Sequence, residues 1–113
     1  MLVKSFQKVI QSSSRVDYVF ESQGFTKTGR KDSPYYRLKL ADLATRTNYE
    51  VQIPIRKIVR GHEEPMYKIT EMTIHLKDPY PKKHPIPDSV VHAAQEKVRE
   101  TLSYLMLDRN LSK

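Results

Sequence analysis

A strict alternation of hydrophobic and polar positions marks the middle third of the chain. Apolar side chains occupy every second position from Tyr49 to Ile55, with polar residues or proline between them. A period of two is typical of a strand that buries one face. We therefore expect a strand over residues 48–59, bent or at an edge near Pro54, which has no N–H to donate.

The preceding segment repeats this pattern, and its polar face is mostly basic. It alternates between one apolar set and a second, largely cationic set: Tyr36, Leu38 and Leu40 against Tyr35, Arg37 and Lys39. Asp32-Ser33-Pro34 just before it favours a turn, and we expect another strand over residues 26–31. The loop at 42–47 is too short for a crossover, so these strands should pair antiparallel.

A further strand is expected over residues 66–76, after a turn at 61–65. Met72, Ile74 and Leu76 share one face of this strand, whereas strict alternation places Tyr67 and Ile69 on the other. Either a β-bulge shifts the register within the strand, or both of its faces are partly covered.

Helical spacing appears on both sides of this β-rich centre. Val16, Val19 and Phe20 predict a short helix over residues 13–23, with Ser13 or Ser14 as its cap. Gly24 follows in the position of a left-handed helix end, where Phe25 can fold back onto the last turn. A second helix begins near Pro87 and Asp88, and its apolar stripe is Val91, Ala94, Val98, Leu102 and Leu105.

The remaining segments are less regular. Residues 4–10 predict a strand, although Phe6, Val9 and Ile10 also fit helical spacing. Four prolines between positions 79 and 87 predict an extended connector over residues 77–86. The polar tail at 108–113 is expected to fray.

This order of elements predicts a single α+β domain over residues 1–113. Its two layers would be a curved antiparallel sheet of four to five strands and, on one face of the sheet, a short N-terminal and a long C-terminal helix. The opposite face of the sheet would stay open. Its expected residues are Tyr35, Arg37, Lys39, Gln52, Pro54, Arg56, Tyr67 and Ile69.

The layout resembles the YugN-like family of small bacterial proteins. The resemblance lies in Tyr36-Arg37-Leu38-Lys39-Leu40, in Tyr49-Glu50-Val51-Gln52-Ile53-Pro54-Ile55 and in the late apolar helix. It implies a fold related to one repeat of the TATA-binding saddle. Because that family is itself of unknown function, the resemblance implies no functional residue.

Charge gives the central strands a second property. The chain carries a formal net charge of +7, and between Thr26 and Arg60 nine basic residues face three acidic ones. Such a surface suits phosphate or an acidic partner, although a solvated basic face also protects sheets from aggregation. The candidate binding residues are Tyr35, Arg37, Lys39, Arg56, Lys57, Arg60 and Tyr67.

Catalytic and metal-binding chemistry has little support in the sequence. The absence of cysteine excludes disulfides, thiolate metal sites and a cysteine nucleophile. His62-Glu63-Glu64 is the only local group of metal-capable side chains, and beside Pro65 it fits a solvated turn better than a metal site. No Gly-x-Ser-x-Gly elbow is present. We therefore predict a protein that is not an enzyme and that needs neither cofactor nor metal.

The start of the chain and its hydropathy favour a cytoplasmic location. Lys4, Gln7 and Lys8 interrupt the first ten residues, which therefore lack the apolar stretch of a signal peptide. No segment approaches the roughly 20 apolar residues that cross a bilayer. We expect no membrane association.

Two hypotheses of function follow from the open sheet face. The first is a non-catalytic binding or assembly module that forms a homo-oligomer, because Tyr35, Pro54, Tyr67 and Ile69 would expose an apolar patch. The second is a nucleic-acid-binding protein that uses the same face. Its cations would hold phosphates, and Tyr35 or Tyr67 would stack on bases.

Overall fold

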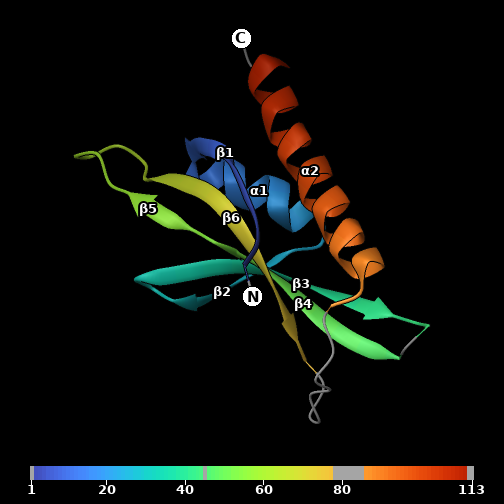
Figure 1. Cartoon of the computed structure of the whole chain (residues 1–113). Helices are drawn as coiled ribbons and strands as arrows, with labels where there is room; N and C mark the ends of the chain where they lie inside the picture. The colour runs from blue at the N-terminus through green and yellow to red at the C-terminus, as the bar shows by residue number, and fades with distance from the viewer. Residues whose placement is uncertain (1, 45, 78–85, 112–113) are drawn as a thin grey trace.

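The computed structural model describes residues 2–44, 46–77 and 86–111, with side chains described for residues 8–44, 46–77 and 86–106. In these ranges one sheet of six strands packs with two helices (Figure 1). The elements are β1 (Leu2–Ser12), α1 (Ser13–Ser22), β2 (Thr26–Arg30), β3 (Ser33–Asp42), β4 (Thr47–Pro54), β5 (Arg56–Ile58), β6 (Met66–Leu76) and α2 (Asp88–Leu111).

The sheet is antiparallel at every described pairing. Its strands lie in the order β1-β6-β4-β3-β2, and β5 pairs with β6 beyond the end of β4. The predicted α+β class, antiparallel sheet and pair of helices are confirmed. Six strands replace the expected four to five, because residues 48–59 form β4 and β5 with a break at Ile55. The expected relation of this fold to one repeat of the TATA-binding saddle remains an analogy.

The buried core lies between the sheet and the two helices. The register places Tyr36 opposite Ile53 and Leu38 opposite Val51, so the apolar sets of β3 and β4 share the covered face, as alternation predicted. The most deeply buried apolar side chains are Val16, Phe20, Tyr36, Val51, Ile53, Ile69, Met72, Ile74, Ala94, Val98 and Leu105. On α2 the stripe also includes Val90 and Thr101, whereas Val91 and Leu102 are only partly buried.

A β-bulge in β6 resolves the ambiguity of that strand. Gln52 pairs with Thr73 and Arg56 pairs with Lys68, so the three residues 53–55 span the same interval as the four residues 69–72 of β6. The extra residue lets two consecutive positions, Thr70 and Glu71, stay partly exposed.

The bulge corrects the placement of Tyr67 and Ile69. Both were expected on the open face, but Tyr67 is 7% exposed and Ile69 is 0% exposed, in the same core as Met72 and Ile74. Strict alternation failed here because the register shifts between the two pairs. The exposed apolar patch that motivated self-association therefore loses two of its four members.

Pro54 lies where the ladder between β4 and β6 is interrupted. The Ile55 N–H donates to the carbonyl of Pro34 at 3.1 Å. Since main-chain groups of successive strand residues point to opposite edges, residue 54 is directed toward β6, inside the bulged interval. A proline costs no ladder hydrogen bond there, so the last residue of β4 can be a proline.

The C-terminal end of α1 has the predicted geometry. Gly24 has φ +93° and its N–H donates to the Glu21 carbonyl, while the Phe25 N–H donates to the Phe20 carbonyl at 3.0 Å. Phe25 packs edge-on against Phe20 with ring centroids 5.1 Å apart. The left-handed glycine thus ends the helix and returns the chain to the core.

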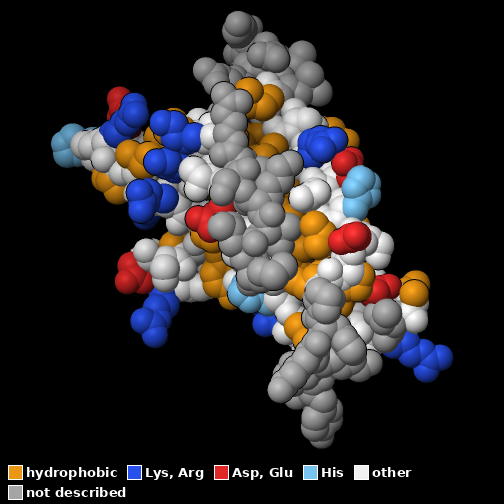
Figure 2. Space-filling model, viewed as in Figure 1, with side chains coloured by type: hydrophobic (Ala, Val, Ile, Leu, Met, Phe, Trp, Pro, Cys, Tyr) orange, Lys and Arg blue, Asp and Glu red, His pale blue; other side chains and the backbone are white. Residues whose placement is uncertain are grey.

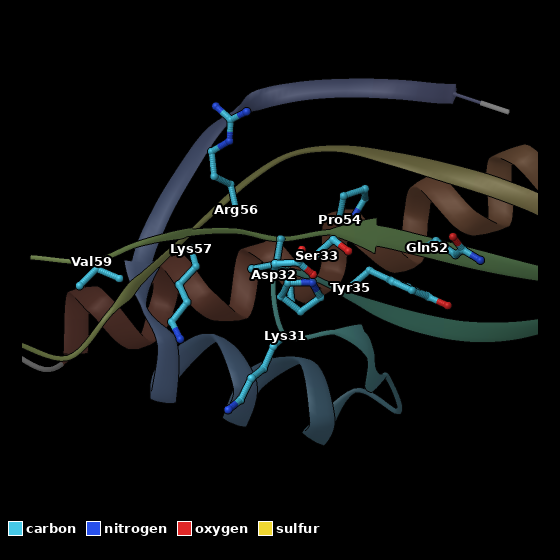
Figure 3. A pocket seen from close by; sticks show the side chains of 11 residues that line it. Lys31, Asp32, Ser33, Tyr35, Gln52, Pro54, Arg56, Lys57 and Val59 are labelled. Atoms are coloured by element: carbon cyan, nitrogen blue, oxygen red, sulfur yellow. The ribbon is translucent and has the colours of Figure 1, made fainter.

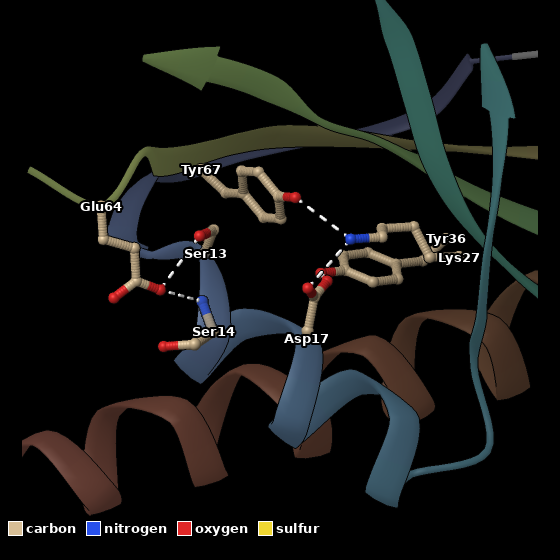
Figure 4. Close-up of polar contacts among 7 residues, drawn as sticks. All are labelled: Ser13, Ser14, Asp17, Lys27, Tyr36, Glu64 and Tyr67. Carbon is tan, nitrogen blue, oxygen red and sulfur yellow. Dashed lines mark hydrogen bonds and ion pairs between the residues drawn. The ribbon is translucent and has the colours of Figure 1, made fainter. Parts of the chain in front are cut away.

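The N-terminal end of α1 is capped from a distant loop. Ser12, the residue before the helix, makes no capping hydrogen bond with its side chain. Instead, Glu64 Oε1 accepts hydrogen bonds from the Ser14 N–H at 2.6 Å and the Ser13 hydroxyl at 3.0 Å (Figure 4). The expected serine cap is therefore replaced by a carboxylate, which also suits the positive end of the helix dipole.

This contact predicts a pH-dependent contribution to stability. The hydrogen bonds from Ser14 and Ser13 lower the pKa of Glu64 from its usual value of 4.5. The stabilisation of the folded state by the ionised Glu64 carboxylate is then complete above the unfolded-state pKa. It is lost as pH falls through the lower folded-state pKa. Urea unfolding between pH 7 and 3 should show that wild type has a higher free energy of unfolding than Glu64→Gln, and that this difference shrinks below about pH 4.5. A difference that persists unchanged to pH 3, or that Glu63→Gln reproduces, contradicts the cap.

Two predicted segments have limited overlap with the described residues. Most of the proline-rich connector at 77–86 lies outside them. The helix α2 continues to Leu111, through part of the tail that was expected to fray. Within the described ranges, neither helix combines the length and apolar character needed to span a membrane.

Candidate functional site

The open face of the sheet carries the predicted polar set of β3 and β4. Tyr35 pairs with Pro54, Arg37 with Gln52 and Lys39 with Glu50. Arg37 and Lys39 are exposed, whereas Tyr35 is half-buried. The face assignments from alternation are therefore confirmed for these two strands.

A buried carboxylate neutralises part of this face. Glu50 is only 2% exposed, and its oxygens lie 3.9 Å from Arg37 Nη1 and 3.4 Å from Lys77 Nζ. The Gln52 side-chain amide also donates to Glu50 at 2.7 Å. Because a buried carboxylate requires such partners, Arg37 serves first as a counter-ion within the protein.

A second polar cluster lies beneath the sheet, beside α1 (Figure 4). The Tyr36 hydroxyl donates to Asp17 Oδ1 at 2.6 Å, and Lys27 Nζ donates to Asp17 Oδ2 at 2.9 Å. Lys27 also donates to the Tyr67 hydroxyl at 3.2 Å and lies 5.4 Å from the centre of the Tyr67 ring. Tyr36 stacks on Phe20 with ring centroids 4.4 Å apart.

The hydrogen bonds of this cluster have a structural role, because they join side chains of α1 and of the sheet. Burial raises the pKa of Tyr36, and the hydrogen bond to Asp17 raises it further, so the phenol stays protonated and donates. Burial lowers the pKa of Lys27, but the hydrogen bonds with Asp17 and Tyr67 outweigh it and leave the pKa raised. Lys27, one of the nine basic residues of the central segment, is therefore a charged partner of Asp17 that joins β2 to α1.

Three further cationic side chains, Lys31, Arg56 and Lys57, gather at the end of the sheet formed by β5. A depression of about 410 Å³ lies between β5 and the turn that joins β2 to β3 (Figure 3). We call it the β5 notch and define it by six of its lining residues: Lys31, Asp32, Pro34, Pro54, Arg56 and Lys57. Figure 2 shows Lys and Arg side chains grouped over β5 at the left of the molecule.

The β5 notch has an uncompensated positive charge. Lys31, Arg56 and Lys57 are exposed and Asp32 is the one carboxylate among its lining residues. Within the described residues no ion pair involves any of these three cations. Arg56 points away from α1, whereas Lys31 and Lys57 point toward the α1 side (Figure 3), so the notch presents cations on both faces of the sheet.

The structure thus separates the residues that the sequence grouped together. Arg37, Lys39 and Arg56 share the open face. Lys57 pairs with the buried Tyr67 and lies on the helix side, while Arg60 is exposed in the loop after β5. Tyr67 is removed from the candidate surface because its ring is in the core and its hydroxyl accepts from Lys27.

Sequence reasoning missed Lys31 and the notch itself. The notch is assembled from two segments about twenty residues apart in sequence, 31–35 and 52–59, and no local pattern joins them. The clearest available signal was Pro54, which marked the place where the strand is interrupted.

Metal-capable groups do not converge in the described part of the chain. Its His, Asp and Glu side chains form no group of three or more that could hold an ion. In the His62-Glu63-Glu64 segment, Glu64 caps α1.

The class of molecule that this geometry defines is a two-layer α+β domain with an open antiparallel sheet. Comparison with solved structures finds the same fold in the uncharacterised conserved protein YugN from Geobacillus kaustophilus HTA426. The two share a TM-score of 0.70 at 19% sequence identity, over 92% of this chain and 90% of the other. The predicted resemblance to YugN-like proteins is confirmed at the level of the fold. No protein-family model and no curated protein matches the chain.

Proposed function

We propose that the protein is a non-catalytic binding module and that the β5 notch holds an acidic segment of a partner protein. The observation that carries this proposal is the set of three exposed cations, Lys31, Arg56 and Lys57, around one depression with a single carboxylate. Complementary charge at such a surface favours encounter with an acidic partner and disfavours basic ones.

The aromatic side chains favour a peptide over a nucleic acid. Binding of single-stranded nucleic acid combines a cationic groove with aromatic faces on which bases stack. Tyr67 is buried and Tyr35 is half-buried, so of the two tyrosines that were expected to stack on bases only Tyr35 keeps part of its surface on the open face. Nucleic-acid binding, the alternative predicted from the sequence, is therefore supported by the positive charge and by one tyrosine in place of two.

Self-association through the open face is the second candidate. Tyr35 pairs with the exposed Pro54 and supplies apolar surface on that face. The loss of Tyr67 and Ile69 to the core makes this surface small. A light-scattering mass that rises from one chain to two with protein concentration would support self-association, and a constant mass of one chain would exclude it.

The proposal is tested by binding of an acidic peptide to matched variants. The probe is a fluorescein-labelled extended peptide of about ten residues with a central Asp-Glu-Asp run, and binding is followed by fluorescence anisotropy. Arg56→Ala with Lys57→Ala should weaken binding by roughly 5- to 30-fold, since two partly exposed charge contacts contribute roughly 0.5–1 kcal/mol each.

The control variant removes the same charge elsewhere. Lys39→Ala with Arg99→Ala takes two exposed cations from outside the notch, so its affinity should stay within about twofold of wild type. Equal losses in the two variants would mean that only net charge matters. A peptide that does not bind at low salt, or an oligonucleotide of equal charge that binds more tightly, would overturn the proposal.

A further inference from the structure

The outer edge of β5 is the part of the β5 notch that offers main-chain groups. β5 pairs with β6 on one side. On its other side, β3 flanks β4 as far as the pair of Tyr35 with Pro54, and the last described main-chain bond runs from the Ile55 N–H to the Pro34 carbonyl. Beyond that bond no described strand pairs with the outer edge of β5, and the space beside this edge is the β5 notch.

Alternation along the strand identifies which residue faces this gap. The N–H and C=O groups of successive strand residues point to opposite edges. The Ile55 N–H points to the β3 side, so the main-chain groups of Lys57 point to that side as well, whereas those of Arg56 and Ile58 point to β6. Lys57 therefore presents one donor and one acceptor to the notch, and no other described residue bonds to them there.

We propose that the acidic partner segment binds as an added β-strand along the outer edge of β5. This inference rests on the proposed function and specifies its mode: main-chain hydrogen bonds to Lys57 supply part of the affinity, and side chains supply the selectivity. The added strand would lie beside β5, beyond the start of β3 at Ser33. The turn at Lys31 and Asp32 limits its extent to a few residues, in keeping with the three residues of β5.

The positions of the cations fit the alternation of such a strand. Consecutive side chains of an added strand point to opposite faces of the sheet. Arg56 lies on the open face and Lys57 on the helix side, toward which Lys31 also points (Figure 3). Two adjacent acidic residues in the partner would thus each meet a cation. The ligand class is an extended peptide with consecutive carboxylates.

Amide hydrogen exchange separates this mode from purely electrostatic binding. On ¹⁵N-labelled protein saturated with the Asp-Glu-Asp peptide, the Lys57 amide should exchange at least roughly tenfold more slowly than in free protein. The Arg56 and Ile58 amides, which already face β6, should change little. Two further peptides carry N-methyl groups, one on the odd-numbered amides and the other on the even-numbered amides. Only one of these sets can face Lys57, so only one of the two peptides should lose binding.

The outcomes distinguish this inference from the proposed function. If the peptide binds but the Lys57 amide is not protected, or if both methylated sets bind equally, strand addition is wrong and an electrostatic contact remains. If the peptide does not bind at all, both proposals fail. Lys57 could instead serve only to keep the edge of β5 from pairing with other strands. In that case the Lys57→Ala variant will self-associate, and adding the peptide will not slow amide exchange at residue 57. That result also overturns the inference.

Discussion

Replacing Ile69 by lysine is expected to unfold the protein or to lower its free energy of unfolding by more than about 4 kcal/mol. Ile69 is 0% exposed, and a cation at that position would lie in an apolar core without a partner. Strict alternation along β6 predicts the opposite result, because it places this side chain on the open face. The variant therefore tests the β-bulge directly.

The matched control is Thr70→Lys at the adjacent position. Thr70 is only partly buried within the bulge, so a long side chain there can reach water, and the expected loss is about 1 kcal/mol or less. Both variants are compared by urea unfolding followed by circular dichroism. A stable Ile69→Lys protein with an unfolded Thr70→Lys protein would show that the phase of β6 is the reverse of that described.

The strands β3 and β4 were predictable because each buries one face only. In that situation the side-chain period of two appears directly in the sequence, and Tyr36, Val51 and Ile53 could be assigned to the core before any coordinates. The end of α1 was predictable for a different reason. Gly24 followed by Phe25 is a local signal that needs no knowledge of the rest of the fold.

The phase of β6 depended on contacts that no local pattern records. Both halves of the strand alternate regularly, and only the pairing with β4 and β5 shows where the extra residue lies. The burial of Glu50 is similar. Its position on the polar face was predicted, but its partners Arg37 and Lys77 come from two other places in the chain.

Polar ties between distant elements were also beyond the sequence. Asp17 lies on α1 next to the buried Val16, and β2 has no apolar stripe that would reveal which way Lys27 points. The cap of α1 likewise comes from Glu64, about fifty residues downstream. These contacts redistribute the basic charge of the centre: Lys27 and Arg37 are engaged internally, whereas the three cations of the β5 notch take part in no ion pair within the described residues.

Exchange of charge between the β5 notch and its peptide tests the central claim most directly. The variant Arg56→Glu with Lys57→Glu is compared with wild type for binding of the acidic peptide and of a matched peptide in which Lys replaces each Asp and Glu. We expect the variant to lose roughly 100-fold or more in affinity for the acidic peptide and to gain affinity for the basic one, because each contact changes from attraction to repulsion or the reverse. Lys39→Glu with Arg99→Glu carries the same net charge and should retain the preference of wild type. If the two variants behave alike, or if the notch variant still prefers the acidic peptide, the β5 notch is not the binding site.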